Sequence, residues 1–240
     1  MEKDRVKLVD IPFLNATRKE FVNILKERLD DEKKTFVVTA NPEILMKTKE
    51  NARYKAVVRN ADYVVADGIG VILLSKLKKT PLKERIAGFD LTEDLLEYAN
   101  EKQLSVYLLG AKEEVNETAA LEIEQKYNKL KVVGRHHGYI GIKNREVYLE
   151  LLEKEPDIVF VALGAPKQEL FIREHIKKYD KGLFIGVGGS LDVHAKAVKR
   201  APNIWIRLNL EWLYRMLKQP SRIVRNLKTF KFMIKELFKN

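Results

Sequence analysis

The sequence predicts an α/β fold in which a mainly parallel sheet carries helices on both faces and further helices follow. Two observations lead to this prediction. From Val6 to Val187, short β-branched runs alternate with longer amphipathic stretches, as in repeated βα units. From Pro202 onward the strand signals stop and apolar residues recur at helical spacing. We therefore expect a Rossmann-like core over residues 1–195 and a basic, amphipathic helical appendage over residues 196–240.

The elements of the core follow from this alternation. Seven segments have the length and the β-branched or aromatic content of strands: residues 6–9, 36–39, 63–66, 105–109, 131–134, 158–163 and 183–187. Parallel strands need long crossover connections, which the amphipathic segments supply as helices. The clearest helical segments cover residues 19–29, 91–101, 113–127 and 167–178. No low-complexity linker or internal repeat divides the core.

Composition limits the class of protein. The chain has 240 residues and no cysteine, which rules out disulfides and thiolate metal sites and predicts a reducing, cytoplasmic setting. No stretch approaches the roughly 18 uninterrupted apolar residues of a membrane span. A hydrophobic content of 45% at this length allows one substantial core with an appendage.

Positive charge is concentrated in the appendage. The net charge is +11, and residues 201–240 supply +7 of it. Such asymmetry indicates a polyanionic partner, which could be a nucleic acid, an anionic membrane or a phosphorylated substrate. A nucleic-acid-binding module would use Trp205 and Trp212 for stacking, but these aromatic residues alternate with aliphatic ones at helical spacing. We therefore expect no nucleic-acid partner.

From Pro202 onward we expect two helical segments, broken near Pro220, where proline removes a helix donor. The second segment reads as a basic amphipathic helix. Its apolar stripe consists of Ile223, Leu227, Phe230, Ile234 and Phe238, and its basic residues include Arg225, Lys228, Lys231, Lys235 and Lys239. Such a helix can lie in a bilayer interface with its basic residues at anionic headgroups, or its stripe can simply dock on the core. We expect membrane association, and self-association is a further way to cover this surface.

Polar residues stand at the ends of two predicted strands. The string TANPE occupies residues 39–43 and the string ADG residues 66–68. In an open parallel sheet, ligands bind beyond the carboxyl ends of the strands, so Asn41 and Asp67 are expected to face one cleft. Helix capping is the alternative for both, since Asn41 precedes a proline and Asp67 precedes an apolar run.

These strings, together with RIAGFDL (residues 85–91), LGA (109–111), APKQE (165–169), GVGGS (186–190), KRAP (199–202) and LEWLYR (210–215), resemble the WecG/TagA/CpsF family of bacterial glycosyltransferases. The resemblance is strongest to its teichoic-acid branch. It implies transfer of N-acetylmannosamine from UDP-N-acetylmannosamine to undecaprenyl-diphosphate-linked N-acetylglucosamine, with a β-1,4 linkage, in wall teichoic acid linkage-unit synthesis. Other branches transfer N-acetylmannosaminuronic acid or hexoses, which remain alternatives.

The resemblance also assigns roles to the strand-end residues. Asp67 is expected to be the base that removes the proton of the acceptor hydroxyl, as an inverting transfer requires. Thr39 and Asn41 would orient the sugar through their hydroxyl and amide groups. Arg85 would contact phosphate, for which its guanidinium is suited, while an ion pair with Glu84 or Asp90 is the alternative.

Metal-independent catalysis is a further expectation, with no cofactor. The chain has no Asp-x-Asp triplet, and the adjacent His136 and His137 would point to opposite faces of a strand. Because the resemblance places the appendage over the active site at a membrane, cationic side chains are expected to stabilise the substrate diphosphate instead. The candidates are Arg215, Arg222 and Arg225. A peripheral location on the inner face of the cell membrane follows.

Glycine-rich strand ends are the candidates for the nucleotide site. They comprise Gly110, Ala111, Gly188 and Gly189, with the side chains of Gln168 and Glu169 as partners for uracil or ribose. The chain lacks the Gly-x-Gly-x-x-Gly spacing of a dinucleotide-binding fold, which argues against an NAD-dependent enzyme. Two residues depart from the family pattern near this site, Lys196 in place of a small residue and Leu191 in place of phenylalanine.

Overall fold

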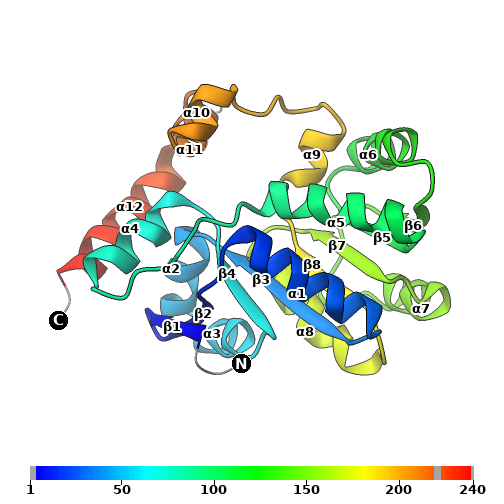
Figure 1. The fold of residues 1–240 in the computed structure, drawn as a ribbon, viewed down its shortest axis with the longest axis horizontal. Helices are drawn as coiled ribbons and strands as arrows, with labels where there is room; N and C mark the ends of the chain where they lie inside the picture. The colour runs from blue at the N-terminus through cyan, green and yellow to red at the C-terminus, as the bar shows by residue number, and fades with distance from the viewer. Residues whose placement is uncertain (1–3, 219–222, 239–240) are drawn as a thin grey trace.

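The computed structural model describes residues 4–218 and 223–238. Within these residues the main sheet has six strands, all parallel, in the spatial order β4-β3-β8-β7-β5-β6 (Figure 1). The strands are β3 (Thr35–Ala40), β4 (Tyr63–Ala66), β5 (Ser105–Gly110), β6 (Lys131–His136), β7 (Ile158–Ala162) and β8 (Leu183–Gly186). The predicted α/β class and parallel sheet are confirmed, and each of these strands ends within two residues of its predicted bounds.

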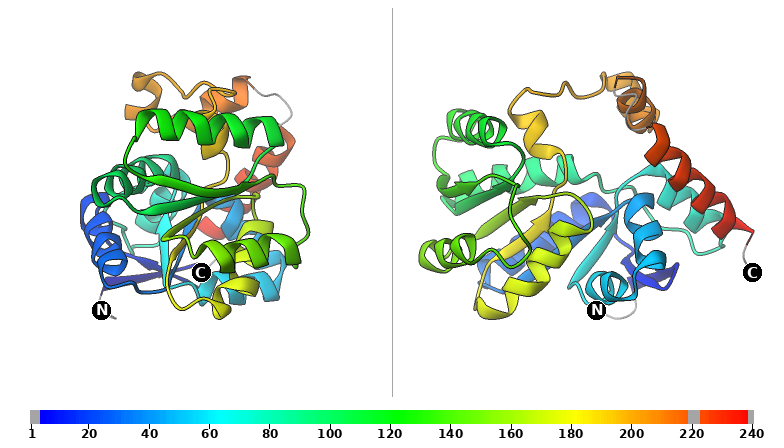
Figure 2. Two further views of the ribbon diagram at one scale, coloured as in Figure 1. Left: turned by 90° about the vertical axis from the view of Figure 1, so that its right-hand side faces the viewer. Right: turned by 180° about the vertical axis from the view of Figure 1, so that it is seen from behind.

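Helices cover both faces of this sheet (Figures 1 and 2). Those that share one apolar cluster with the sheet are α2 (Pro42–Glu50), α3 (Ala52–Arg59), α4 (Ile69–Leu77), α7 (Arg145–Lys154) and α8 (Lys167–His175). Those of the other cluster are α1 (Arg18–Asp30), α5 (Gly88–Lys102), α6 (Glu113–Lys126) and α9 (Ser190–His194). This two-sided cover explains why the strands read as continuous apolar runs.

Strand β3 shows how the sequence divides between the two layers. All six of its residues are buried. Phe36 and Val38 belong to the cluster of α2 and α3, whereas Val37 belongs to the cluster of α1 and α5. Alternate side chains of a strand point to opposite faces, so Thr39 lies on the same side as Val37, next to the start of α5.

The predicted strand at residues 6–9 was wrongly assigned to the parallel sheet. It forms β1 (Arg5–Leu8), which pairs antiparallel with β2 (Ile11–Leu14) in a separate two-stranded sheet. The turn between them places Val9 and Asp10 at φ 52° and 63°. Strand β2 was missed because Pro12 interrupts its apolar pattern, which is tolerated at a sheet edge.

The appendage contains three helices in its described part, α10 (Asn203–Arg207), α11 (Glu211–Lys218) and α12 (Ile223–Leu237), where the sequence predicted two helical segments. The predicted break at Pro220 lies outside the described residues. The core helices agree with prediction, except that residues 176–178 leave α8 as a short 3₁₀ helix.

Helix α12 has two apolar sides. Phe232, Met233 and Leu237 pack against the core beside α2 and α4, as Figures 1 and 2 show. The stripe singled out from the sequence lies elsewhere on the helix and is exposed at its described members, Leu227, Phe230, Ile234 and Phe238. A different side of the helix therefore docks on the core, while the predicted stripe is exposed and its membrane association stays a prediction. None of the described helices combines the length and apolar character needed to cross a bilayer.

Candidate active site at the carboxyl edge of the sheet

Strands β3 and β4 bring the two polar strings together. Thr39 pairs with Val65 and Ala40 with Ala66 in the parallel register. The backbone N–H of Asp67 donates to the carbonyl of Ala40 over 3.0 Å, so the pairing continues one residue beyond β4. The expected proximity of the two strand ends is therefore present in the structure.

A carboxylate and a hydroxyl converge on the start of α5. A Cβ atom added to Gly88 would lie 3.2 Å from Thr39 Oγ1 and 3.5 Å from Asp67 Oδ2. The Thr39 hydroxyl is buried and donates to the carbonyl of Gly186 over 3.0 Å. Because Gly88 has no side chain, the buried start of α5 can pack closely against both groups, and the hydroxyl and the carboxylate approach one point of the backbone.

Helix capping distinguishes Asn41 from Asp67. The Asn41 side-chain oxygen accepts a hydrogen bond from the N–H of Ile44 over 3.0 Å and caps α2. Helix α4 begins after Gly68, whose φ is 115°, and has no side-chain cap. The capping alternative is therefore confirmed for Asn41 and wrong for Asp67, whose half-buried carboxylate lies at the open edge of the sheet.

Arg85 lines a basic cavity beside this pair. The cavity has a volume of about 430 Å³ and is bounded by Arg18, Ile69, Ile72, Lys76, Lys83, Glu84, Arg85, Asp90 and Asn209. Asn209 belongs to the appendage and lies between α10 and α11. The site therefore includes a wall supplied by the appendage.

The four cations of this cavity are not equivalent. Arg18 donates two hydrogen bonds to Asp94 over 2.7 and 2.8 Å, and Lys83 contacts Glu20 over 3.2 Å. Neither Arg85 nor Lys76 forms an ion pair with any residue that the structure describes. The alternative pairing of Arg85 with Glu84 or Asp90 is thus absent from the described part, and two cations stay available for an anion.

The RIAGFDL and KRAP strings meet in space. Asp90 forms ion pairs with Arg200 and, over 3.8 Å, with Arg18. The Arg200 guanidinium lies 4.5 Å from the ring centroid of Phe89, and the His194 ring stacks on Phe89 at 5.1 Å. These contacts fix the segment leading to the appendage against the start of α5, next to the Thr39 and Asp67 pair.

A second feature of the edge is the topological switch point between β5 and β7. The helix after β5 lies in one layer and the helix after β7 in the other, so the loops diverge at this point. Such a topological switch point is the usual ligand crevice of an open α/β sheet. Gly110 ends β5 here at φ 128°, and an added Cβ would come within 2.4 Å of the Ala162 backbone.

The remaining glycines of the nucleotide candidates lie on the neighbouring loop after β8. Gly188 has φ 52°, and nothing lies within 4 Å of the position where its Cβ would be. Gly189 precedes α9, where an added Cβ would contact the Asp192 carboxylate at 3.5 Å. The backbone at Gly188 is therefore exposed, and a planar ligand group can approach it. Leu191, one of the two departures from the family pattern, is fully buried.

Gln168 and Glu169 are buried and engaged internally. Tyr54 Oη and Gln168 Nε2 donate to the two Glu169 oxygens over 2.9 and 2.6 Å. Gln168 Oε1 accepts from the N–H of Gly164 over 3.2 Å. In this arrangement both side chains support the loop after β7 instead of reaching solvent, and their contact with a nucleotide stays a prediction.

Burial raises the pKa of Glu169 above its usual value of 4.5, although hydrogen bonds from Gln168 and Tyr54 oppose the shift. A carboxyl group whose pKa is higher in the folded state stabilises the fold below pH 4.5, and this contribution is lost as the pH rises through the folded-state pKa. Glutamine does not titrate, so the variant lacks this pH dependence. We therefore expect the unfolding free energy of the parent to fall relative to that of Glu169→Gln as the pH rises from 4.5 through the folded-state pKa of Glu169. Urea unfolding from pH 4 to 8 measures it, and parallel pH profiles would contradict the assignment.

The three appendage arginines cannot be placed as fully. Arg222 lies outside the described residues, and the side chains of Arg215 in α11 and Arg225 in α12 are not described. Their role stays a prediction. Lys196, the departure from the family pattern, is exposed with φ 57° and contacts Glu122. Its side chain reaches Glu122 of α6 and is largely in solvent.

The two adjacent histidines do not point apart as predicted. His136 ends β6 and His137 lies beyond it, so strand alternation no longer applies, and their ring centroids are 4.4 Å apart. Among the described residues, no group of three or more His, Asp or Glu side chains could hold a metal ion.

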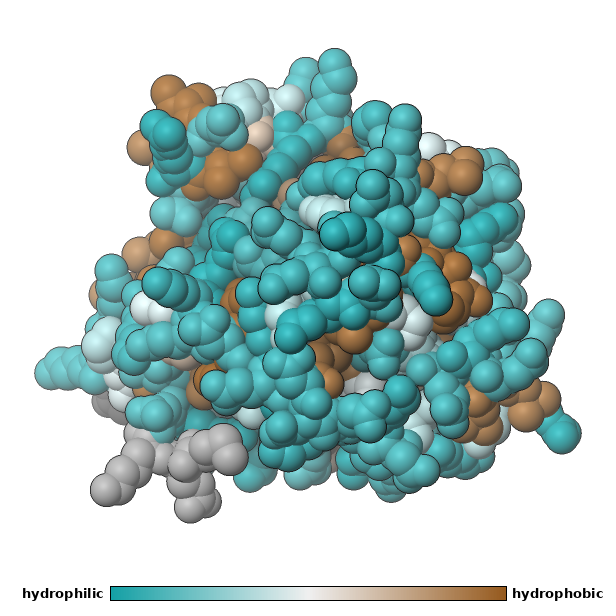
Figure 3. All heavy atoms as spheres, turned by 45° about the vertical axis from the view of Figure 1, so that its right-hand side comes forward, coloured by the Kyte–Doolittle hydropathy of each residue, from teal (hydrophilic) through white to brown (hydrophobic). Residues whose placement is uncertain are grey.

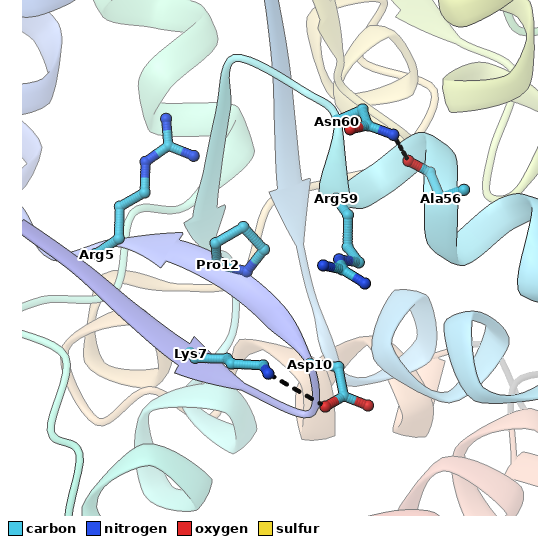
Figure 4. Close-up of a pocket in the computed structure, with 7 residues that line it drawn as sticks. All are labelled: Arg5, Lys7, Asp10, Pro12, Ala56, Arg59 and Asn60. Carbon is cyan, nitrogen blue, oxygen red and sulfur yellow. Dashed lines mark hydrogen bonds and ion pairs between the residues drawn. The ribbon is translucent and has the colours of Figure 1, made fainter. Parts of the chain in front are cut away.

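Another cavity, of about 510 Å³, lies by the β1–β2 hairpin and the end of α3 (Figure 4). Arg5 donates to the carbonyl of Asp62, just before β4, over 2.9 Å. Lys7 contacts Asp10 over 3.8 Å, and Lys55 also binds Asp10. This cavity is therefore at the amino end of β4, opposite the edge that carries Asp67.

Three residues of the site were not recognised from the sequence. Gly88 belongs to the RIAGFDL string, but its proximity to Thr39 depends on how α5 packs. Lys76 and Asn209 join Arg85 only through the folding of α4 and the appendage. The positive φ of Asn209, 59°, is a conformation that asparagine tolerates better than most residues, which is a weak local signal.

An open parallel sheet with a topological switch point, a carboxylate next to a hydroxyl and a basic cavity defines an α/β protein built to bind phosphorylated ligands at one edge. Comparison with known proteins gives the family. The model of the glycosyl transferase WecG/TagA/CpsF family matches residues 6–240, so the chain belongs to this family.

Curated relatives cover nearly the whole chain. The chain is 40% identical over 224 residues to an N-acetylglucosaminyldiphosphoundecaprenol N-acetyl-beta-D-mannosaminyltransferase of Bacillus spizizenii, covering 93% of this chain and 87% of the relative. Proteins with the same name match at 38% identity in Bacillus subtilis, over 94% of this chain and 88% of the relative, and in Staphylococcus aureus, over 92% and 87%. The family resemblance seen in the sequence is thus confirmed.

Proposed function

We propose that this protein transfers N-acetylmannosamine from UDP-N-acetylmannosamine to N-acetylglucosaminyldiphosphoundecaprenol, the reaction for which its relatives are named. The supporting feature of the structure is the approach of Thr39 Oγ1 and Asp67 Oδ2 to one point at Gly88, the start of α5. A β-1,4 linkage formed with inversion needs a base and a sugar-orienting group at the same point. The names of the relatives favour this donor over a uronic acid or a hexose.

In this mechanism Asp67 accepts the proton of the acceptor hydroxyl as that oxygen attacks the anomeric carbon. The bond from that carbon to the UDP oxygen breaks, and UDP leaves with the electron pair. Thr39 is held by its hydrogen bond to Gly186, which fixes its hydroxyl oxygen toward the sugar. Arg85, which has no ion pair in the described part of the chain, offers its guanidinium to phosphate oxygens.

The donor nucleotide is assigned to the switch point between β5 and β7 and the adjoining loop after β8. Asp67 follows β4, which is separated from β5 by β3, β8 and β7. At about 4.8 Å per strand, this separation is about 19 Å along the edge. An extended nucleotide-sugar with its uridine near Gly110 and Gly188 would present its sugar toward the Asp67 end.

The appendage is proposed to attach the protein to the inner face of the cell membrane. Its exposed apolar side chains are Ile204, Leu208, Trp212, Leu217, Leu227, Phe230, Ile234 and Phe238. Figure 3 shows apolar side chains gathered at the top of the molecule, where Figure 1 places α10 and α11. Basic residues on the same helices suit anionic headgroups, and Trp205 packs on Tyr214 at 5.7 Å instead of offering a stacking face.

Transfer is proposed to be metal-independent, with Arg215, Arg222 and Arg225 neutralising the departing diphosphate. The test is UDP release from UDP-N-acetylmannosamine with the lipid-linked acceptor, in EDTA and with added Mg²⁺. We expect equal rates under the two conditions and no release without acceptor. No turnover under either condition would contradict the proposed donor and acceptor pair. Turnover only with Mg²⁺ would contradict the proposal that arginine side chains take the place of a metal ion.

A further inference from the structure

Helix α4 links the catalytic edge to the surface of the molecule. It starts two residues after Asp67, and Ile69, Ile72 and Lys76 project from one side of it into the basic cavity. At 1.5 Å per residue, Lys76 lies about 10 Å along the axis from Ile69. A ligand that begins at Asp67 and follows α4 therefore meets apolar side chains first and a lysine at the far end.

The charge of this cavity selects an anion. Arg18 and Lys83 are neutralised by Asp94 and Glu20, whereas Lys76 and Arg85 have no ion pair among the described residues. Glu84, the other carboxylate of the lining besides Asp90, accepts from the N–H of Arg18 over 2.9 Å. Two available cations lining one cavity, one from α4 and one from the segment before α5, suit a diphosphate.

Exposed leucines continue the path beyond the cavity. Leu73 and Leu77 are 50% and 63% exposed, although both occupy a core helix that packs against α12. Each follows a cavity-lining residue of α4, so they flank the cavity on one side of the helix. The open stripe of α12, which is proposed to meet the bilayer, belongs to the helix packed beside α4.

We propose that α4 is the acceptor-binding helix, an inference that rests on the proposed function. The diphosphate of the polyprenyl acceptor lies between Arg85 and Lys76, its sugar reaches back to Asp67, and its first isoprene units cover Leu73 and Leu77. The occupant is a polyprenyl diphosphate because the basic, anion-binding cavity and the apolar surface are contiguous along one helix. Asn209 of the appendage closes the cavity over the diphosphate.

The test is calorimetric binding of farnesyl diphosphate to the full chain, with saturating UDP present to occupy the donor site. We expect Lys76→Gln to weaken binding about tenfold, since it removes one charge-assisted contact. Lys79→Gln is the matched control, because Lys79 is exposed three residues away and outside the cavity lining. Equal binding by the parent and both variants would overturn the proposal.

A second pair of variants tests the isoprene surface. The double substitution Leu73→Ser and Leu77→Ser should weaken farnesyl diphosphate binding and leave inorganic pyrophosphate binding unchanged. Leu121→Ser on α6, which replaces a leucine that is 62% exposed, should change neither. If the double variant instead loses only its adhesion to acceptor-free vesicles, the leucines contact the bilayer and not the acceptor, and the proposal is wrong.

Steady-state kinetics separates this inference from the proposed function. Lys76→Gln should raise the KM for the lipid-linked acceptor while the KM for the UDP-sugar stays unchanged. If the parent binds farnesyl diphosphate through Lys76 but transfers no N-acetylmannosamine, the proposed function is wrong and the proposed binding site on α4 still holds. A parent that transfers the sugar with an acceptor KM insensitive to Lys76 would contradict the site alone.

Discussion

Replacing Asp67 by asparagine should reduce transfer by about 100- to 10,000-fold, the range of a general base. Asparagine keeps the shape of the side chain but cannot accept the proton of the acceptor hydroxyl at neutral pH. Because α4 is capped at Gly68 without a side-chain bond, the substitution removes no helix cap. UDP release and product analysis measure the loss, and circular dichroism checks that the fold persists.

Asp31→Asn is the control for this experiment. Asp31 is an exposed aspartate after α1 that contacts Lys33 over 2.7 Å, and it precedes the amino end of β3, opposite the end that carries Thr39. Its substitution should leave both activity and folding essentially unchanged, since exposed pairs contribute about 0.2–1 kcal/mol. If Asp67→Asn turned over at the rate of the parent, Asp67 would not be the base, and the Thr39 and Asp67 pair would be only a binding feature.

Deleting residues 203–240 should lower transfer to a vesicle-embedded acceptor by about 100-fold or more, because positioning and charge stabilisation are lost together. The cut keeps Arg200 on Asp90, so the segment against α5 stays in place. It also uncovers the core where Phe232, Met233 and Leu237 packed, and some loss of stability is expected. Cooperative thermal unfolding of the truncated chain would show that the core still folds.

A full-length variant separates the two proposed roles of the appendage, attachment to the membrane and charge stabilisation of the diphosphate. Phe230→Gln with Phe238→Gln removes two of the exposed apolar side chains and keeps every basic residue. We expect this variant to lose vesicle binding and vesicle-dependent activity, while activity on a short-chain, water-soluble acceptor is retained. Full activity of the truncated chain on the lipid acceptor would show that the appendage has no part in the reaction.

Local patterns were sufficient to place the parallel strands. Residues 36–39 and 63–66 are short, apolar and flanked by polar turns, and both became strands because their backbone groups pair and their side chains are covered on both sides. The pattern failed at residues 11–14, where Pro12 interrupts the apolar pattern of an edge strand. It also could not show that residues 6–9 leave the main sheet, since the partner of a strand is not encoded within it.

By itself, the sequence determined the α/β class, the positions of the six parallel strands along the chain, the family, and the position of Asp67 and Asn41 after two of those strands. These depend on residue types and short spacings. Only the tertiary structure decided that Asn41 is a helix cap, that Thr39 and Asp67 approach each other's surroundings at Gly88, and that Glu169 is enclosed by Tyr54 and Gln168. These features arise between residues distant along the chain, whose approach is set by how layers of helices pack on the sheet.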